Sequence, residues 1–337
     1  MTFLKDDTGT SSATVIYANQ TSTLTEIVGD GSRDLILAHG DNIAVLASSS
    51  VASTQIGGNL EVVVQGSGDV IVTNPNVHNS AFFNEMTSPQ TMTYDLTGLV
   101  THNLTVNGQD LSGFGSSVAL YDGPEIAHGA SGATTYMYGI DAIYGTDSGD
   151  TFIGGTLTNG ENFGQEFYAG NGANTVVDIG YGLNQQYGNQ YFNSAVTVSY
   201  AESTSGITVQ MGDPAMHVVA HDVTAYLDGY VFHGAATDML YGVQDIQGSA
   251  HNDVFHNYGE SGILFHSSLG DDSYSGDGNA ADTEVSYEDS GSAVTINLSG
   301  STTNGLANGQ AIHDGTYIDS LSCIEQVRLA SDYSGKL

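Results

Sequence analysis

The sequence predicts an all-β protein in which stacked turns and short strands build a β-solenoid. Three observations carry this prediction. Nine-residue units place a carboxylate or amide in sixth place and a large apolar residue in eighth. Longer segments recur along the chain, and such repeats stack because no single copy can bury its apolar face alone. Short Val, Ile and Leu runs alternate with clusters of Gly, Asn, Asp and Ser, which is typical of strands joined by turns.

Residues 1–126 are predicted to form a β-rich N-terminal domain, either a solenoid or a sandwich. Short apolar runs such as TVIYA, LILAHG and LEVVVQ alternate with turn-forming residues, and no amphipathic helix pattern interrupts them. The segment GDGSRDLIL at 29–37 fits the nine-residue frame, with Asp34 in sixth place and Ile36 in eighth. We therefore expect Asp34 to lie on a turn of the same kind.

Residues 127–337 form the second predicted domain, in which one segment recurs. MYGIDAIYGTDSGDTF at 137–152 aligns without gaps with LYGVQDIQGSAHNDVF at 240–255, and a degenerate copy begins at Leu321. We expect strands and turns here, with no long helix, and inward-facing side chains at the matched positions. The residues expected to be buried are Phe152, Phe255, Tyr274, Val176, Ile140 and Val243.

A second segment recurs ahead of copies of the first. SYAESTSGITVQM at 199–211 aligns with SYEDSGSAVTINL at 286–298. Turns and strand pairs therefore follow each other in a fixed order towards the C-terminus. Residues 156–194 are predicted to be an insertion because they are rich in Gly, Asn, Gln and Tyr. Such polar, aromatic tracts form flexible loops or assembly surfaces, and we favour a loop.

Nine-residue units carry the candidate site. GSAHNDVFH at 248–256 and SSLGDDSYS at 267–275 have small residues in the first two places, a carboxylate in the sixth and an aromatic ring in the eighth. AGNGANTVV at 169–177 has Asn174 in the sixth place. A turn whose carbonyls and carboxylate face one way offers the oxygen ligands that Ca²⁺ prefers. The alternative is that these Asp and Asn residues only form turns.

The charge of the chain is extreme. Four Lys and Arg residues oppose 38 Asp and Glu residues, which gives a formal net charge of −34, and no Lys or Arg lies between Asp34 and Val327. Nucleic-acid binding is excluded because nothing could neutralise phosphates, and no apolar run is long enough for membrane insertion. Self-repulsion on this scale destabilises a compact fold unless counterions are held. Bound divalent cations are therefore expected, although such acidity also suits a protein from a salty medium.

Residues 127–337 resemble the RTX family of secreted bacterial proteins, whose nonapeptides alternate with segments of the type SYxxSxSGVTVNL and DTLxGIENIxGSxxNDxF. The matching residues are 199–211, followed by TDMLYGVQDIQGSAHNDVF at 237–255. The resemblance implies a right-handed parallel β-roll that folds on Ca²⁺. It also implies export by a type I system without a cleaved N-terminal signal, which suits a start, MTFLKDDTG, that has no apolar signal region.

Carried over position by position, the resemblance implies a set of calcium ligands. The set comprises Asp150, Asp253, Asp272, Asn174, Asp282 and Asp34. The third copy departs from the pattern, since Leu329 stands where the earlier copies have Gly145 and Gly248. We expect this copy to cap the stack without binding calcium.

No catalytic constellation stands out in the sequence. In HVVAH, His217 and His221 have the spacing of zinc ligands on a helix, but Val218 replaces the Glu that such metalloproteases need. The sequence contains no G-x-S-x-G nucleophile elbow. Cys323 is alone, so no intrachain disulfide forms, and its alternating apolar surroundings predict burial rather than nucleophilic chemistry.

The sequence therefore favours a calcium-dependent, secreted structural or adhesive protein over an enzyme. We expect it at the surface of a bacterial cell or in the extracellular matrix, as an adhesin, an S-layer-like protein or an assembly subunit. Its expected partners are calcium and either further copies of itself or a surface polysaccharide. Two alternatives stay open. One is a β-helix enzyme that modifies polysaccharides as a lyase or epimerase, by analogy alone, and the other is a carbohydrate-binding module.

Overall fold

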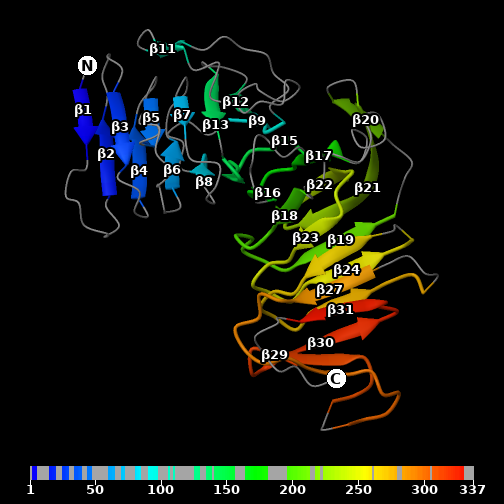
Figure 1. Ribbon diagram of the computed structural model, residues 1–337. Helices are drawn as coiled ribbons and strands as arrows, with labels where there is room; N and C mark the ends of the chain where they lie inside the picture. The colour runs from blue at the N-terminus through cyan, green and yellow to red at the C-terminus, as the bar shows by residue number, and fades with distance from the viewer. Residues whose placement is uncertain are drawn as a thin grey trace.

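A computed structural model gives the architecture of the chain (Figure 1). It describes residues 80–84, 90–97, 125–129, 134–138, 140–155, 164–180, 196–212, 217–220, 223–259, 262–278, 283–303 and 306–329. It also describes short strands between residues 2 and 110, whose bounds follow.

Almost all described strands belong to two long sheets. The 18-stranded sheet, called sheet A, contains β1 (Thr2–Lys5), β3 (Thr25–Gly29), β5 (Ala44–Ala47), β7 (Val70–Val72), β9 (Met92–Asp95), β12 (Glu125–Gly129), β13 (Thr135–Tyr138), β15 (Thr151–Gly154), β17 (Thr175–Asp178), β19 (Ile207–Met211), β20 (His217–Ala220), β21 (Val223–His233), β22 (Ala236–Tyr241), β24 (Val254–Asn257), β26 (Ser273–Ser275), β28 (Thr295–Asn297), β29 (Gln310–His313) and β30 (Tyr317–Ser322). The 11-stranded sheet, called sheet B, contains β2 (Val15–Asn19), β4 (Asp34–His39), β6 (Leu60–Val64), β8 (Ser80–Phe82), β14 (Ala142–Tyr144), β16 (Gln165–Tyr168), β18 (Val196–Ser199), β23 (Asp245–Gln247), β25 (Ile263–His266), β27 (Thr283–Tyr287) and β31 (Gln326–Leu329). A separate hairpin pairs β10 (Thr105–Val106) with β11 (Gln109–Asp110). The described part of the chain is therefore all-β, as predicted.

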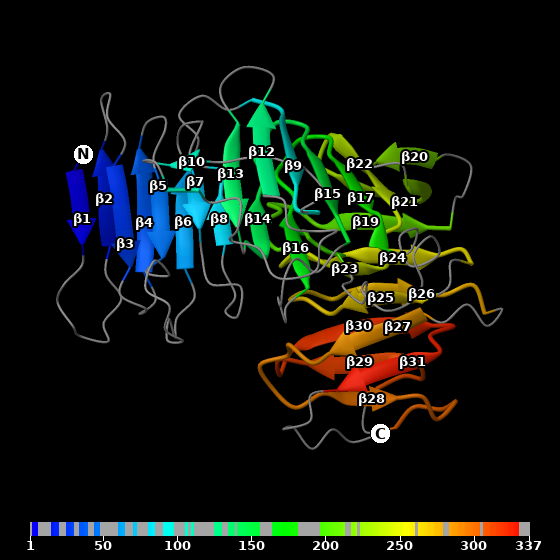
Figure 2. The same ribbon diagram turned by 45° about the horizontal axis from the view of Figure 1, so that its top comes forward.

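Consecutive strands alternate between the two sheets over most of the chain. Sheet B is parallel throughout its described length, from β2 to β31. Parallel neighbours need a crossover connection between them, and here each crossover contains at least one strand of sheet A. Figures 1 and 2 show the resulting rows of strands lying side by side from the N-terminal end to the C-terminal end.

Three antiparallel excursions interrupt this alternation, all of them in sheet A. They are formed by β9, β12 and β13, by β19, β21 and β22, and by β28, β29 and β30. In each, the last strand returns to pair in parallel with the strand before the excursion, namely β7, β17 or β26. The recurring sequence segments contain β19 and β28, the first strands of the second and third excursions, and the ends of the last strands β13, β22 and β30. The predicted domain boundary after residue 126 falls inside β12, which pairs with strands on both sides of that boundary.

A column of inward-facing side chains fills the space between the sheets. The six residues predicted to be buried are fully buried, which confirms the register: Phe152, Phe255, Tyr274, Val176, Ile140 and Val243. The rings of Phe255 and Tyr274 stack with centroids 4.7 Å apart, and Phe265 of sheet B lies 4.9 Å from Phe255. Full burial of one such side chain stabilises a fold by about 1.5–3 kcal/mol, so this column supplies much of the stability.

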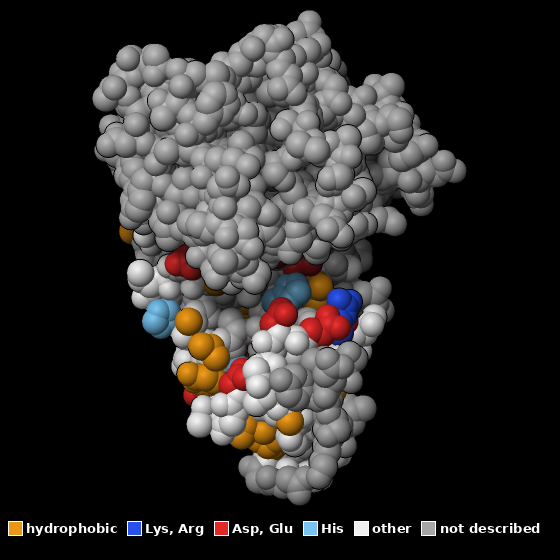
Figure 3. All heavy atoms as spheres, turned by 60° about the vertical axis from the view of Figure 1, so that its left-hand side comes forward, with side chains coloured by type: hydrophobic (Ala, Val, Ile, Leu, Met, Phe, Trp, Pro, Cys, Tyr) orange, Lys and Arg blue, Asp and Glu red, His pale blue; other side chains and the backbone are white. Residues whose placement is uncertain are grey.

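The outer face of sheet B changes character along its length. In the middle of the sheet, on β8, β14 and β16, the rings of Phe82, Tyr144 and Tyr168 stack with centroids 4.1 and 4.0 Å apart. Stacked aromatic pairs of this kind stabilise a sheet beyond the area that they bury. Towards the C-terminal end, Arg328 makes two 2.9 Å contacts to Glu284, and Figure 3 shows acidic, basic and histidine side chains gathered there.

Two expectations need correction. Cys323 is exposed, and its φ of +53° matches the left-handed conformation of Gly242 (φ +72°) in the preceding copy. The turn breaks the alternation on which the expected burial of Cys323 rested. The predicted insertion at 156–194 is not wholly a loop, because it contains β16 and β17, one strand for each sheet. Within the described ranges, no helix is long and apolar enough to cross a membrane.

Candidate calcium-binding turns

Four of the six predicted ligands lie directly before strands of sheet A. Asp150 precedes β15, Asn174 precedes β17, Asp253 precedes β24 and Asp272 precedes β26. Their exposed fractions are 1%, 0%, 1% and 2%. The nine-residue frame therefore places its sixth residue on a turn, with the side chain inside the molecule.

The small residues at the start of each unit make room for the carboxylate. A Cβ at Gly248 would lie 2.5 Å from Asp253 Oδ2 and 3.0 Å from the Phe255 ring. A Cβ at Gly145 would meet the equivalent pair, the Asp150 carboxylate at 2.9 Å and the Phe152 ring at 2.6 Å. The first, sixth and eighth places of the unit are thus linked by direct packing.

The second residue of the unit binds the carboxylate within the turn. The backbone N–H of Thr146 donates to Asp150 Oδ2 over 2.7 Å, and the backbone N–H of Ser249 donates to Asp253 Oδ2 over 2.7 Å. The hydroxyls also donate, from Thr146 to Asp150 (3.1 Å) and from Ser249 to Asp253 Oδ1 (2.7 Å). These bonds satisfy backbone groups that a buried turn would otherwise leave unpaired.

The sixth-place residues also join successive turns into ladders. In the first ladder, the Met92 N–H donates to Asp150 Oδ1 (2.8 Å) and the Asp150 N–H donates to Asn174 Oδ1 (2.9 Å). The Asn174 N–H then donates to Asp238 Oδ1 over 2.7 Å. Because Asn174 is neutral, it separates the charges of Asp150 and Asp238.

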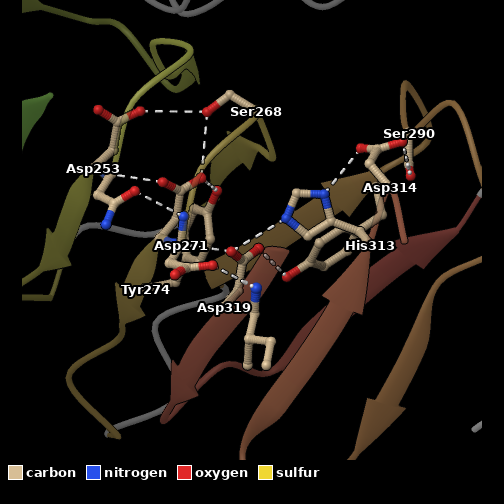
Figure 4. A network of polar contacts seen from close by, with 12 residues as sticks. Asp253, Ser268, Asp271, Tyr274, Ser290, His313, Asp314 and Asp319 are labelled. Atoms are coloured by element: carbon tan, nitrogen blue, oxygen red, sulfur yellow. Dashed lines mark hydrogen bonds and ion pairs between the residues drawn. The ribbon is translucent and has the colours of Figure 1, made fainter. Parts of the chain in front are cut away.

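The second ladder contains three carboxylates in a row. The Ile207 N–H donates to Asp253 Oδ1 (2.8 Å), and the Asp253 N–H donates to Asp272 Oδ1 (2.8 Å). The Asp272 N–H donates to Asp319 Oδ1 over 2.9 Å. Figure 4 shows this row of side chains with its bridging contacts.

Sequence reasoning missed the residue that ends each ladder, Asp238 or Asp319. Each stands two places before the first residue of the recurring segment, Leu240 or Leu321, where the first copy has Thr135. This shared position was a usable signal. It was missed because the strands β22 and β30 belong to excursions, outside the nine-residue frame.

Burial dominates the electrostatics of the ladders. Burial raises the pKa of Asp150 to about 7, against the lowering effect of the hydrogen bonds from Met92 and Thr146. Burial also raises the pKa of Asp272 to about 7, and there the nearby Asp319 and Asp253 carboxylates raise it further. The pKa of Asp253 is raised by burial as well. With no Lys or Arg between residues 34 and 327, these turns are short of positive charge at neutral pH.

The residues fit Ca²⁺ best between the turns of Asp253 and Asp272. Ser268 Oγ lies 3.3 Å from both Asp253 Oδ2 and Asp272 Oδ2, and Tyr274 Oη lies 3.1 Å from Asp272 Oδ2. Since the donors on Asp272 Oδ2 are hydroxyls, they can turn their protons away and leave oxygen lone pairs for a cation. Backbone N–H groups bind both oxygens of Asp150, from Met92 and Thr146, and both oxygens of Asp253, from Ile207 and Ser249. Among these three carboxylates, Asp272 therefore has the oxygen, Oδ2, that accepts from hydroxyls rather than from backbone N–H groups. Within the described residues, no group of three or more His, Cys, Asp or Glu side chains has the arrangement of a metal site.

The other predicted site residues are only partly covered. Asp282 lies outside the described residues, and so does His221. Asp34 begins β4 and His217 begins β20, but their side chains are outside the described part of the chain. Among the described carboxylates, the structure brings together Asp253 and Asp272 and keeps Asp150 with Asn174 in a separate ladder.

No model of a known protein family matches the chain, and no curated protein matches it either.

Proposed function

We propose that the protein is a calcium-dependent structural or adhesive subunit of a bacterial cell surface or extracellular matrix. The proposed architecture is a right-handed β-solenoid, in which the alternation between sheets A and B is a continuous coil. The observation that carries the proposal is the second ladder. It buries Asp253, Asp272 and Asp319 in a row, within a chain of net charge −34.

Calcium would act between successive turns. The oxygens there are Asp272 Oδ2, Ser268 Oγ and Tyr274 Oη, together with Asp253 Oδ2, which also accepts from the Ser249 N–H. Calcium binds the deprotonated carboxylate, so it competes with the proton that burial favours on Asp272. A cation between two turns neutralises charge and holds neighbouring repeats together, so binding and stability are coupled.

A structural role is supported over a catalytic one by where the acidic side chains lie. The described carboxylates with raised pKa values, Asp150, Asp178, Asp253 and Asp272, are all at least nine-tenths buried. Each holds backbone N–H groups of its own turn or of a neighbouring one. A general acid or base must reach the substrate, whereas these groups hold the stack together.

Calorimetric titration with CaCl₂ tests the proposal. We expect Asp272→Asn to weaken calcium binding at least about tenfold, because the variant loses a charged ligand. The increase in Tm on addition of calcium should be smaller in this variant than in the unaltered protein. Asp178→Asn is the matched control. Asp178 is also buried, and burial raises its pKa to about 6. It lies at the end of β17, away from the turn of Asn174, where its carboxylate accepts from the backbone N–H groups of Gly180 and Val196. Equal loss of calcium affinity in the two variants, or no binding by the unaltered protein, contradicts the assignment.

The structural role is tested separately. Sedimentation in calcium and incubation with acidic polysaccharides distinguish an assembly or adhesive subunit from an enzyme. We expect calcium-dependent self-association or polysaccharide binding with no change in polysaccharide chain length. Shortened or unsaturated sugar products would contradict the structural role.

A further inference from the structure

A cluster of Tyr, Asp and His closes the first ladder. Tyr200 Oη donates to Asp238 Oδ2 over 2.8 Å, and His233 Nε2 lies 2.9 Å from Asp238 Oδ1. The three side chains come from the end of β18, from β22 and from the end of β21, and all are buried. We call them the middle cluster.

The same cluster recurs at the end of the second ladder. Tyr287 Oη donates to Asp319 Oδ2 over 2.8 Å, and His313 Nε2 lies 3.3 Å from Asp319 Oδ1. The ring centroids of Tyr and His are 5.6 Å apart in both clusters. The recurrence of composition, position and geometry indicates that the cluster has the same role in the second and third excursions.

The two clusters differ at one residue. His313 Nδ1 lies 3.0 Å from Asp314 Oδ2, while the residue after His233 is Gly234. Both residues adopt left-handed backbone conformations, with φ of +45° at Asp314 and +54° at Gly234. A non-glycine residue in this region is strained, and such strain persists where other contacts hold it in place. Ser290 Oγ, which donates to Asp314 Oδ1 over 3.3 Å, is one such contact.

Two carboxylates around one imidazole set its protonation. A neutral imidazole has one N–H, whereas an imidazolium has two. His313 can donate to both Asp319 and Asp314 only as the imidazolium (Figure 4). Among the described residues, His233 contacts one carboxylate oxygen, Asp238 Oδ1, through Nε2, and Gly234 offers no second carboxylate at the position of Asp314.

We propose that Tyr287, His313, Asp314 and Asp319, here called the C-terminal latch, hold the β28–β30 excursion on the stack while His313 is doubly protonated, and loosen it at alkaline pH. This goes beyond the calcium-dependent role and does not depend on calcium. The middle cluster has Gly234 in place of Asp314, so the proposal assigns no such pH dependence to the β19–β22 excursion.

The groups around His313 support a stable positive charge. Asp319 faces the ring from β30 and Asp314 from the adjoining turn, while the rings of Tyr287 and Tyr317 pack against it. Behind Asp319 lies Asp272, which belongs to β26's turn. Burial lowers the pKa of His313, but hydrogen bonds and attraction from Asp319 and Asp314 outweigh burial and raise it to about 9.

The direction of the pH effect follows from this raised pKa. Between the ordinary histidine value of about 6.5 and about 9, opening releases a proton, so the opening constant rises about tenfold for each pH unit. The protonated His313 therefore contributes its full stabilisation of the closed latch below about pH 6.5, and this stabilisation is lost as the pH rises through about 9. Over the whole window the opening constant rises on the order of 10²-fold.

Hydrogen exchange of the excursions, followed by mass spectrometry in EGTA, tests the latch. After correction for the intrinsic exchange rate, protection of 306–322 should fall about tenfold per unit between pH 7 and 9. In Asp314→Gly, the factor by which the protection of 306–322 falls between pH 7 and 9 should be at least about tenfold smaller. In Gly234→Asp, the protection of residues 229–241 should begin to fall with rising pH in the same way. A Cβ at Gly234 would have no neighbouring atom within 4 Å, so the new side chain has space.

A nitrogen NMR spectrum of the histidine rings gives an independent readout. At pH 7.5 both ring nitrogens of His313 should carry protons, with assignment through His313→Gln. A neutral His313 ring at that pH would overturn the proposal. So would protection of 306–322 that is flat between pH 7 and 9, or an unchanged pH dependence in Asp314→Gly.

Discussion

At the scale of single residues, the first place of each nine-residue unit decides whether the carboxylate can be buried. Gly145 and Gly248 leave room for the sixth-place carboxylate and the eighth-place ring in their own units. Neither glycine has a positive φ, so the requirement for glycine is one of space rather than of backbone conformation. In the third copy Leu329 takes this place, and its role as a cap stays a prediction.

Gly248→Ala should lower the free energy of unfolding by about 1–3 kcal/mol, as overpacking in a filled core does. The new methyl group would lie 2.5 Å from Asp253 Oδ2 and Ser268 Oγ. Chemical denaturation measures the effect. Ala250→Ser, at an exposed position of the same turn, is the control and should change stability by less than about 0.5 kcal/mol. Similar changes in the free energy of unfolding for both variants would contradict the tight packing around Gly248.

At the scale of elements, the molecule combines plain turns with antiparallel excursions. The plain turns stack aromatic residues in register, as Phe255 does with Tyr274. The second and third excursions end in Tyr–Asp–His clusters, but the first has Phe83 and Thr135 at the matched positions. An excursion can therefore form without the cluster, which suits a role in fastening rather than in setting the topology.

Phe255→Ala should destabilise the stack by about 3–5 kcal/mol, the usual cost of removing a fully buried ring. Its ring has neighbours in both sheets, with centroids 4.7 Å from Tyr274 and 4.9 Å from Phe265. Tyr258→Ala is the control, since Tyr258 lies just beyond the same strand and is 61% exposed. Thermal unfolding should separate the two variants clearly. A smaller loss for Phe255→Ala than for Tyr258→Ala would place the core elsewhere.

At the scale of the whole molecule, the sequence revealed what repeats locally. The sixth and eighth places of the unit are set by contacts within about nine residues, so Asp253 and Phe255 could be placed from sequence. Asp238 and Asp319 share a position ahead of the recurring segment, but their role could not be placed from sequence, because their partners Tyr200 and Tyr287 are 38 and 32 residues away. Such partners meet only through the excursion topology. The neutral role of Asn174 between two carboxylates likewise depends on which strands become neighbours.

The pH dependence of stability belongs to this scale too. A carboxyl whose folded pKa lies above its unfolded value binds more protons in the folded state between the two values, so stability falls as pH rises through that window. For Asp150 and Asp272 the window runs from about 4 to about 7. In EGTA the Tm should therefore fall by several degrees from pH 4.5 to 7.5. In saturating CaCl₂ the fall should shrink, because calcium takes the place of the protons. A Tm that rises with pH in EGTA would contradict the raised pKa values.

The net charge of −34 makes repulsion between carboxylates a feature of the whole molecule. Monovalent salt screens repulsion between exposed charges over a Debye length of about 10 Å at roughly 0.1 M. It does not supply the six to eight oxygen contacts that hold Ca²⁺ between turns. Extracellular calcium modules bind at about 10⁻⁴–10⁻³ M, and one site at 100 Kd stabilises the native state by about 2.7 kcal/mol.

Thermal unfolding and sedimentation at pH 7.5, in EGTA plus NaCl and in CaCl₂ at matched ionic strength, test the central claim most directly. We expect a Tm higher by several degrees in about 10 mM CaCl₂, together with a calcium-dependent change in oligomeric state. The same Tm and the same sedimentation in both buffers would contradict calcium dependence and would leave the ladders as hydrogen-bonded rows neutralised by protons.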